Sequence, residues 1–302
     1  MVLPVGDWAA VLGTPRIEHL PQVSNPVWLA TADDGEVYVL KRLPEHSPGV
    51  GLVEEFRVLL HLQANGVPVA VPLITDDGHI CARREGVSYI LIPRLPTDDD
   101  DPPGAVVGAA IARLHKALAT YAWPIRSFTH DLVPEFHGLD LPAELMDRTV
   151  APHRDWLIAA MSDLPMQRIH GDCNNGNVLV HEGNFSGFID LDHLPIGPRV
   201  YDVAYYLVHL MQDRHRRQDG NSASFLSFAG ELLDGYRSEA TLSERETVAV
   251  APTMLAAAAG LADWHGRERS YDADKLDENA AAMTWICEHL DELTAAVRPA
   301  GG

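Results

Sequence analysis

The chain has 302 residues, a length that fits one large domain or two lobes and excludes a peptide or a mini-protein. Hydrophobic residues make up 46% and charged residues 22%, which is enough apolar surface to form a core and argues against wholesale disorder. The 43 acidic residues outnumber the 23 basic ones, and the formal charge of −20 disfavours binding to nucleic acids or anionic membranes.

Cysteine usage and hydropathy bear on the location of the protein. The three cysteines, Cys81, Cys173 and Cys287, lie far apart and form no Cys-x-x-Cys pair, which argues against a disulfide framework or a zinc site. No basic segment followed by an apolar run occurs at the N-terminus, and the most apolar stretch, residues 248–262, is interrupted by Pro252 and too short to span a membrane. The sequence therefore predicts a cytoplasmic protein without membrane contact.

The first third of the chain is predicted to form strands joined by tight turns. These strands are expected over residues 27–32, 37–40, 69–74 and 89–92. Asp33-Asp34-Gly35 between the first two runs is typical of a hairpin turn. Residues 53–65 have helical spacing, and Gly66 occupies the position favoured after a helix. One helix is thus expected within this group of strands.

The rest of the chain is predicted to be mostly helical. The segments with helical spacing are residues 105–121, 144–161, 201–213, 224–236, 243–264 and 277–296. The change of pattern divides the chain into a sheet-rich lobe, residues 1–93, and a helix-rich lobe, residues 94–302. This order predicts an α+β fold in which two lobes face each other across a ligand-binding cleft.

Polar residues are densest in His170-Gly171-Asp172-Cys173-Asn174-Asn175-Gly176-Asn177, which two short β-rich runs follow, ending at Asp190. If Gly183-Asn184 forms the turn between these runs, paired residue numbers sum to 367 and Asn177 lies opposite Asp190. Cross-strand neighbours lie about 5 Å apart at Cβ, close enough for an amide oxygen and a carboxylate to share one hard cation. Asp172, on the loop that leads to Asn177, would face the same point.

Phosphoryl transfer requires such an arrangement: a carboxylate that orients and deprotonates a hydroxyl, and oxygen ligands that hold magnesium against nucleotide phosphates. Three motifs make the comparison specific, and they are listed in chain order: His170-Gly171-Asp172 with Asn177, Ile189-Asp190-Leu191-Asp192, and Arg199-Val200-Tyr201-Asp202-Val203-Ala204. Together they resemble the catalytic signature of the aminoglycoside phosphotransferase and choline kinase-like family of small-molecule kinases. The resemblance implies a bilobal protein-kinase-like fold, with a small antiparallel sheet lobe that carries one main helix and a larger, mostly helical lobe.

The resemblance also implies residue roles in the helical lobe. Asp172 would be the catalytic base, Asn177 and Asp190 would bind Mg²⁺, and His170 and Asp202 would brace the catalytic loop. The alternative is that these residues are turn and cap residues of a solvated loop. The ordered recurrence of five motif elements argues against that alternative.

In the first lobe, the resemblance assigns the nucleotide phosphates to Lys41, which ends the strand over residues 37–40. Glu55, on the following helix, would hold the lysine, and Glu54 is the alternative by one residue. The apolar residues that mark the inward face of this helix favour Glu55, because it lies closer to that face. Those apolar residues are Phe56, Leu59 and Leu60.

The nucleotide site is otherwise weakly marked. No G-x-G-x-x-G or Walker motif occupies the expected phosphate-covering loop, where backbone N–H groups and the hydroxyl of Ser24 are the candidates. Ile92 and Arg94, in the linker between the lobes, are the candidates for contact with the base. The sequence therefore predicts ATP or GTP as co-substrate without a choice between them.

The acceptor of relatives lies between the catalytic loop and the C-terminal helices, which points to Asp192, Asp263, Trp264 and Glu268. Carboxylates and aromatic faces suit an amino-bearing acceptor, but helix packing and a solvated face explain the same residues equally well. The prediction is a magnesium-dependent phosphotransferase that acts on a hydroxyl of a small molecule, such as an aminoglycoside or another antibiotic. The alternatives are a metabolic kinase of homoserine, choline, ethanolamine or a sugar, and a non-catalytic pseudokinase, against which the intact motifs argue.

Overall fold

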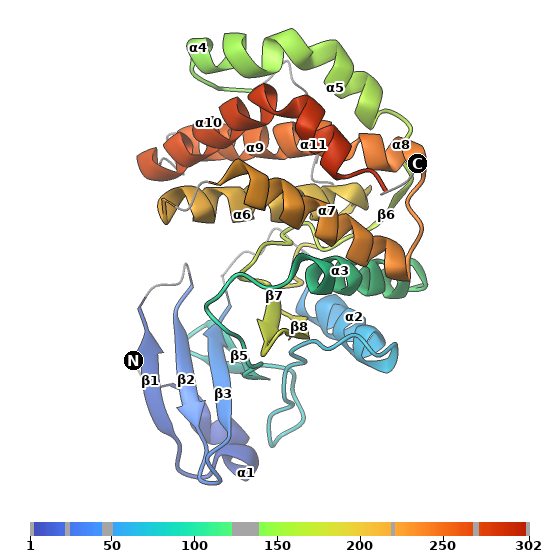
Figure 1. Cartoon of the computed structure of the whole chain (residues 1–302). Helices are drawn as coiled ribbons and strands as arrows, with labels where there is room; N and C mark the ends of the chain where they lie inside the picture. Colours follow the sequence, from blue (N-terminus) through green and yellow to red (C-terminus); the bar gives the residue numbers. More distant parts are fainter. Residues whose placement is uncertain are drawn as a thin grey trace.

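The structure is a computed structural model, and it describes residues 3–21, 25–43, 51–122, 139–218, 221–267 and 272–299. A sheet formed by the N-terminal residues lies at one end of the molecule, and stacked helices form the larger remainder (Figure 1). This arrangement is the α+β architecture that the sequence predicts.

The N-terminal sheet has five antiparallel strands in the order β1-β2-β3-β5-β4. Its strands are β1 (Arg16–Leu20), β2 (Val27–Thr31), β3 (Val37–Arg42), β4 (Ala82–Arg84) and β5 (Val87–Pro93). The hairpin of β2 and β3 confirms the predicted turn over residues 33–35. Because β3 pairs with β2 on one side and β5 on the other, the strand that ends in Lys41 is fixed on both edges.

A small hydrophobic core holds the sheet to the N-terminal helices η1 (Val5–Trp8), a 3₁₀ helix, and α1 (Ala9–Leu12). Trp8 and Leu12 are fully buried in this core together with Leu40 of β3. The indole N–H of Trp8 also donates to the carbonyl oxygen of Leu73 at 2.9 Å. Burial of apolar side chains of this size contributes about 1.5–3 kcal/mol each.

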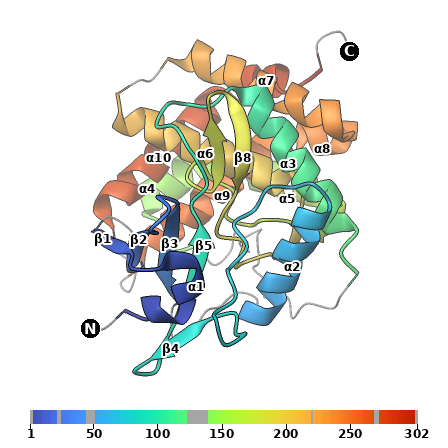
Figure 2. The same cartoon turned by 90° about the horizontal axis from the view of Figure 1, so that it is seen from below.

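Helix α2 (Leu52–Ala64) forms where the sequence predicts a helix, but its buried face differs from the prediction. Val58, Leu59 and Leu62 are buried and belong to the hydrophobic core of the helical part, whereas Leu60 is 43% exposed. The prediction that Leu60 faces inward is therefore wrong, because the buried stripe follows the helical spacing of the other three residues. Figures 1 and 2 both show α2 beside α3 (Gly104–Ala119). The lobe boundary at residue 93 stays a prediction.

Residues 69–74 do not form the predicted strand. Val69 makes one isolated bridge to Phe188, and the N–H of Phe188 donates to the carbonyl oxygen of Pro68 at 3.0 Å. Pro68 and Pro72 have no N–H to donate, so a continuous ladder of hydrogen bonds cannot form along this segment. The segment is instead an extended connection that leads toward β4.

Helices make up most of the chain after α3. They are α4 (Ala143–Leu145), α5 (Arg154–Met161), α6 (Val200–Arg216), α7 (Ser222–Glu239), α8 (Glu244–Val248), α9 (Val250–Gly266), α10 (Ala273–Glu288) and α11 (Leu290–Ala296). A π-helix, η2 (Met146–Val150), and a 3₁₀ helix, η3 (Ala151–His153), join α4 to α5. Helix α9 lies in the middle of the stack and is buried along most of its length (Figure 1). Helices that are apolar on all sides are typical of such central positions.

Three of the segments with helical spacing are interrupted in the structure. The breaks fall at residues 146–153, at Ala249 and at His289. Pro152 and Pro252 account for two of them, because proline is tolerated in the first turn of a helix and disrupts its interior. Among the described helices none has both the length and the apolar composition that a membrane span requires.

Two further sheets have two strands each. One pairs β6 (Met166–Arg168) with β9 (Ile196–Pro198), and the other pairs β7 (Val178–His181) with β8 (Asn184–Phe188). Figure 2 shows the β7–β8 hairpin in front of α6. The predicted catalytic loop runs between β6 and β7.

The turn of the β7–β8 hairpin differs from the prediction. Its central residues are Glu182 and Gly183, with φ angles of 49° and 72°, and His181 pairs with Asn184. Positive φ angles at both central positions define the turn type that matches the twist of a hairpin, and glycine adopts the second without steric cost. The predicted turn at Gly183-Asn184 is therefore wrong.

A bulge in β8 changes the pairing again toward the open end of the hairpin. Ser186 has no opposite residue, and beyond it the pairing is shifted by one residue. The N–H of Ile189 donates to the carbonyl oxygen of Asn177 at 3.1 Å. The predicted pairing of Asn177 with Asp190 is therefore wrong by one residue, since the neighbour of Asp190 occupies that position.

Candidate active site

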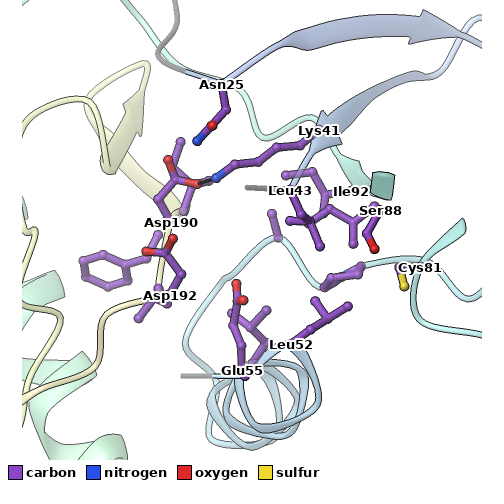
Figure 3. A pocket seen from close by; sticks show the side chains of 18 of the residues that line it. Asn25, Lys41, Leu43, Leu52, Glu55, Cys81, Ser88, Ile92, Asp190 and Asp192 are labelled. Atoms are coloured by element: carbon purple, nitrogen blue, oxygen red, sulfur yellow. Dashed lines mark hydrogen bonds and ion pairs between the residues drawn. The ribbon is translucent and has the colours of Figure 1, made fainter. Parts of the chain in front are cut away.

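A cavity of about 340 Å³ lies where the N-terminal sheet, α2 and the segment after β8 meet (Figure 3). Five charged side chains line it: Lys41 from β3, Glu55 from α2, Arg83 from β4, and Asp190 and Asp192 from the segment after β8. The apolar residues of its wall include Leu43, Leu52, Leu59, Ile90, Ile92 and Leu191. The fold thus gathers in one cavity five of the residues that the sequence analysis selected.

Lys41 and Asp190 form an ion pair in this cavity, although 149 residues separate them in the chain. The Nζ of Lys41 lies 2.5 Å from Oδ1 of Asp190. Burial alone lowers the pKa of Lys41, but the charge of Asp190 and its hydrogen bond outweigh burial, so the pKa is raised. The lysine therefore carries its positive charge at the position where nucleotide phosphates are expected.

Glu55 lies on the opposite wall of the cavity, with its carboxylate toward that of Asp192 (Figure 3). Burial, and then the charge of Asp192, raise the pKa of Glu55 to about 7, although the charge of Lys41 lowers it. Glu54 is instead directed toward its own helix N-terminus, since a Cβ at Gly51 would meet its Oε2 at 2.7 Å. The described residues contain no ion pair between Lys41 and Glu55, because Lys41 is engaged by Asp190.

The carboxylate of Asp172 is held by two amide side chains of its own loop. Asn174 donates from Nδ2 to Oδ1 at 3.1 Å, and Asn177 donates from Nδ2 to Oδ2 at 2.9 Å. The same Nδ2 of Asn177 donates to the backbone oxygen of Asp172 at 2.8 Å. Both amide hydrogens of Asn177 are thus directed at Asp172, which leaves its Oδ1 on the other side as an oxygen ligand.

The carboxylate of Asp190 is, after Oδ1 of Asn177, the second oxygen group suited to a divalent cation. The φ of Asp190 is 55°, in the left-handed region, which is uncommon outside glycine and is concentrated at functional sites. A carboxylate and an amide oxygen are hard ligands of the type that Mg²⁺ prefers, so Asp190 and Asn177 fit the expected metal. The described residues include no cluster of three His, Cys, Asp or Glu that could bind a metal alone. Mg²⁺ usually keeps several waters and binds through one or two protein oxygens together with substrate phosphates, and a pair such as Asn177 and Asp190 suits that habit.

A buried carboxylate, Asp202 of α6, is bonded to the loop that carries Asp172. It accepts hydrogen bonds from the N–H groups of His170 at 2.8 Å and Gly171 at 2.9 Å, and from Nε2 of His115 at 2.9 Å. Burial alone raises the pKa of Asp202, but the hydrogen bonds and charge of His115 outweigh it, so the pKa is lowered. These contacts are the ones that the predicted bracing role requires.

His170 and Gly171 determine the path of the loop. The N–H of Asp172 donates to Nδ1 of His170 at 3.3 Å, so Nε2 carries the proton and donates to the oxygen of Ile189 at 3.1 Å. Gly171 has a φ of 82°, and a Cβ there would lie 2.5 Å from Cδ of Pro195. Only glycine therefore fits this position. The hydrogen bond from His170 connects the loop to Ile189, the residue before Asp190.

The remaining predicted residues are not brought together. Ser24 and Glu268 lie outside the described residues. The buried carboxylate of Asp263 accepts from the N–H of Asp140 at 2.7 Å and from the guanidinium of Arg267 at 2.5 Å, which are packing contacts. Trp264 is 58% exposed. An acceptor role for these two described residues stays a prediction without a supporting contact.

Arg94 also gives limited support to its predicted role. Its side chain is exposed, and its N–H donates to the carbonyl oxygen of Val37 at 3.2 Å. Pro93, before it, has no N–H. Contact with a nucleotide base would therefore need another group of Arg94, whereas Ile92 already lines the cavity.

Sequence analysis missed a stripe of rings on α6 that faces Asp172. Tyr201 and Tyr205 have ring centroids 5.5 Å apart, and those of Tyr205 and His209 are 4.6 Å apart. The spacing of four residues between each pair is the signal that could have identified the stripe, because such residues share one helix face.

A model of the phosphotransferase enzyme family matches residues 17–246. This chain belongs to that family. Stress response kinase A of Escherichia coli strain K12 is 28% identical to this phosphotransferase over an alignment of 201 positions, and the match covers 61% of the chain and 60% of the relative. The match therefore spans less than two thirds of that relative's length. The predicted enzyme class, a phosphotransferase, is confirmed by the family.

Two solved structures are similar to the phosphotransferase over nearly its whole length. A microcompartment-associated aminopropanol kinase is 16% identical, with a TM-score of 0.74, and the match covers 97% of this chain and 98% of that one. Amicoumacin kinase hAmiN, in complex with AMP-PNP and Ca²⁺, is 19% identical, with a TM-score of 0.67 and coverage of 90% and 88%. These likenesses confirm the predicted fold of the small-molecule kinases.

Proposed function

We propose that this protein transfers the γ-phosphoryl group of ATP or GTP to a hydroxyl of a small amino-bearing molecule, with Mg²⁺ as the metal. The observation that carries this proposal is the position of Asp172. Its carboxylate is held by two amides on a loop bonded to buried Asp202, and the same loop is connected through His170 to the residue before Asp190. A base and a metal ligand are thereby held in one rigid arrangement, which phosphoryl transfer needs.

Lys41 and Glu55 serve the nucleotide in this proposal. The ammonium of Lys41 binds nucleotide phosphates, and its place on a strand paired at both edges keeps it in position. Asn177 and Asp190 would hold the metal, which supplies positive charge to neutralise the transferred phosphoryl group. Glu55, on the opposite wall, would be the counter-ion of Lys41 with Asp190 holding the metal.

Asp172 serves the acceptor. A carboxylate has about four lone-pair positions, so the bonds from Asn174 and Asn177 leave capacity for an acceptor hydroxyl. The hydroxyl oxygen forms a bond to the γ-phosphorus, the bond from that phosphorus to the bridging oxygen of the nucleoside diphosphate breaks, and the hydroxyl proton passes to Asp172. The atoms and charges of the step balance without a further reactant.

An amino-bearing acceptor, such as an aminoglycoside or another antibiotic, is favoured by the net charge of −20, which attracts cations. One structural neighbour is named for an amino alcohol, aminopropanol. A metabolic kinase of homoserine, choline, ethanolamine or a sugar would use the same catalytic residues. A cytoplasmic location stays a prediction of the sequence.

Purified protein with ATP or GTP, magnesium and a series of hydroxyl compounds tests the proposal. Asp172→Asn should lower turnover at least about a hundredfold and leave nucleotide affinity unchanged, because general-base catalysis contributes that much or more. Asp163→Asn is the matched control, since its carboxylate is 84% exposed. Full activity of Asp172→Asn, or a wild-type protein that neither transfers phosphate nor hydrolyses the nucleotide, would contradict the proposal.

A further inference from the structure

The ring stripe on α6, made of Tyr201, Tyr205 and His209, lies near Asp172. The negative charge of Asp172 acts on all three side chains: after burial, it is among the influences that raise the pKa values of both tyrosines, and it opposes the lowering of the pKa of His209. The stripe is packed, because Tyr201 stacks on Tyr205 and the ring of His209 contacts that of Tyr205 in a tilted arrangement. Asp172 and His209 are therefore on the same side of α6, with Tyr205 between them.

His209 ends this stripe with an unsatisfied polar atom. Its Nε2 is buried and has no hydrogen-bond partner within the described part of the chain. Leaving a buried donor or acceptor unpaired costs about 1–3 kcal/mol, so such an atom requires an explanation. Its neighbour Gln212 shows the contrast, since that buried amide donates to Oδ1 of Asn279 at 2.6 Å. On this face of α6, a polar side chain with a purely structural role thus has its hydrogen-bond partner within the protein.

The surroundings keep the imidazole of His209 neutral. Burial lowers its pKa to about 4, and the positive charges of Lys275 and Arg216 act in the same direction. A neutral imidazole has one donor and one acceptor nitrogen, and it forms hydrogen bonds with hydroxyls and amines. It does not attract an anion by charge.

We propose that Nε2 of His209 binds the acceptor at a second hydroxyl or amine, next to the hydroxyl that Asp172 deprotonates. This inference rests on the proposed function and makes the acceptor class more specific. Asp172 takes one hydroxyl of the acceptor, and a neutral imidazole bonds a hydroxyl or an amine, so the acceptor carries at least two polar groups. The acceptor class is therefore an amino alcohol or a polyol.

The second hydrogen bond has a defined effect on the reaction. It fixes the orientation of the acceptor, so that the reactive hydroxyl faces Asp172 and the γ-phosphorus together. Acceptors with two neighbouring polar groups gain this orientation, and simple alcohols do not. His209 is thus a specificity-determining residue, and its loss should affect the first kind of acceptor selectively.

The test compares paired acceptors in one assay. The probes are 1-amino-2-propanol against 2-propanol, and 1,2-propanediol against 1-propanol, with nucleotide hydrolysis in the absence of acceptor measured in parallel. In the wild-type protein kcat/KM should be at least about tenfold higher for the first member of each pair. His209→Ala should remove this preference, whereas His209→Gln, which retains a neutral hydrogen-bonding group, should keep most of it.

The ratio within one variant is independent of the fraction that is folded, so a purely structural role of His209 would leave it unchanged. His215→Ala, an exposed histidine of the same helix, is the control and should keep the wild-type ratio. An unchanged ratio in His209→Ala would overturn the inference. The same conclusion follows if the wild-type protein hydrolyses nucleotide but does not distinguish the paired acceptors or uses none of them. Absence of both hydrolysis and transfer would instead refute the proposed function.

Discussion

Replacement of Asp202 tests how the protein holds its catalytic loop. Oδ2 of Asp202 accepts from the N–H of His170 and from Nε2 of His115, and Oδ1 accepts from the N–H of Gly171. In Asp202→Asn the amide oxygen can occupy the Oδ2 position and keep two of the three bonds. The amide nitrogen then faces the N–H of Gly171, so two donors oppose each other. Asp202→Ala removes all three bonds.

The structure sets the expected magnitudes. Asp202→Asn leaves one buried backbone donor unpaired, which costs about 1–3 kcal/mol of the free energy of unfolding. Asp202→Ala leaves three donors unpaired at a fully buried position, and loss of one partner from a buried charged network costs about 3–5 kcal/mol. We therefore expect the order of stability to be wild type, then Asn, then Ala. The kcat should fall in the same order, because the loop that carries Asp172 loses its support.

The effect should also depend on pH. The folded-state pKa of Asp202 lies below its ordinary value of 3.8, so the unfolded chain takes up the proton first as the pH falls. The stabilisation by Asp202 is complete above about pH 4 and is lost as the pH falls through the folded-state pKa. The difference in unfolding free energy between wild type and Asp202→Asn should therefore stay constant from about pH 7 to about pH 4 and shrink as the pH falls further.

Urea unfolding, followed by tryptophan fluorescence and circular dichroism, measures these differences. Asp234→Asn is the control, since that carboxylate is 62% exposed in an ion pair with Arg237 and should change stability by less than about 1 kcal/mol. An Ala variant as stable as the wild type, or more stable than the Asn variant, would refute the hydrogen-bond argument. A difference that grows at low pH would refute the assigned sign of the pKa shift.

Three further predictions concern the cavity between the sheet and the helices. Lys41→Ala should weaken nucleotide binding and lower turnover, and Glu55→Gln should chiefly lower turnover. Glu54→Gln serves as the control. If steady-state kinetics show a defect in Glu54→Gln alone, the assignment of Glu55 rather than Glu54 would be reversed. Asp190→Ala should abolish the magnesium dependence of nucleotide affinity in calorimetric titrations, and an unchanged dependence would exclude it as a ligand. The pKa of Glu55 is raised to about 7 from 4.5, so in the metal-free protein its contribution to stability is present below about pH 4.5 and is lost as the pH rises through 7. Glu55→Gln should remove this pH dependence of the melting temperature in thermal unfolding.

Local signals in the sequence were sufficient for the elements whose structure depends on nearby residues. The turn over residues 33–35 and helix α2 follow from turn chemistry and helical spacing, and the structure contains both. The motif around Asp172 indicated the family, because the order and spacing of its residues are specific. The sequence also indicated Glu55 rather than Glu54 for the cavity, although Leu60, one of the residues used in that argument, is exposed.

Only the tertiary structure decided which distant groups meet. The bulge at Ser186 changed the pairing near Asp190, and a bulge depends on how both strands pack against their surroundings. The ion pair of Lys41 with Asp190 joins segments 149 residues apart, and no local pattern encodes such a contact. The buried Nε2 of His209, which has no partner among the described residues, is visible only when the neighbours of α6 are in place. Periodicity and turn chemistry act within a few residues, whereas burial and electrostatic interactions depend on the packing of the whole chain.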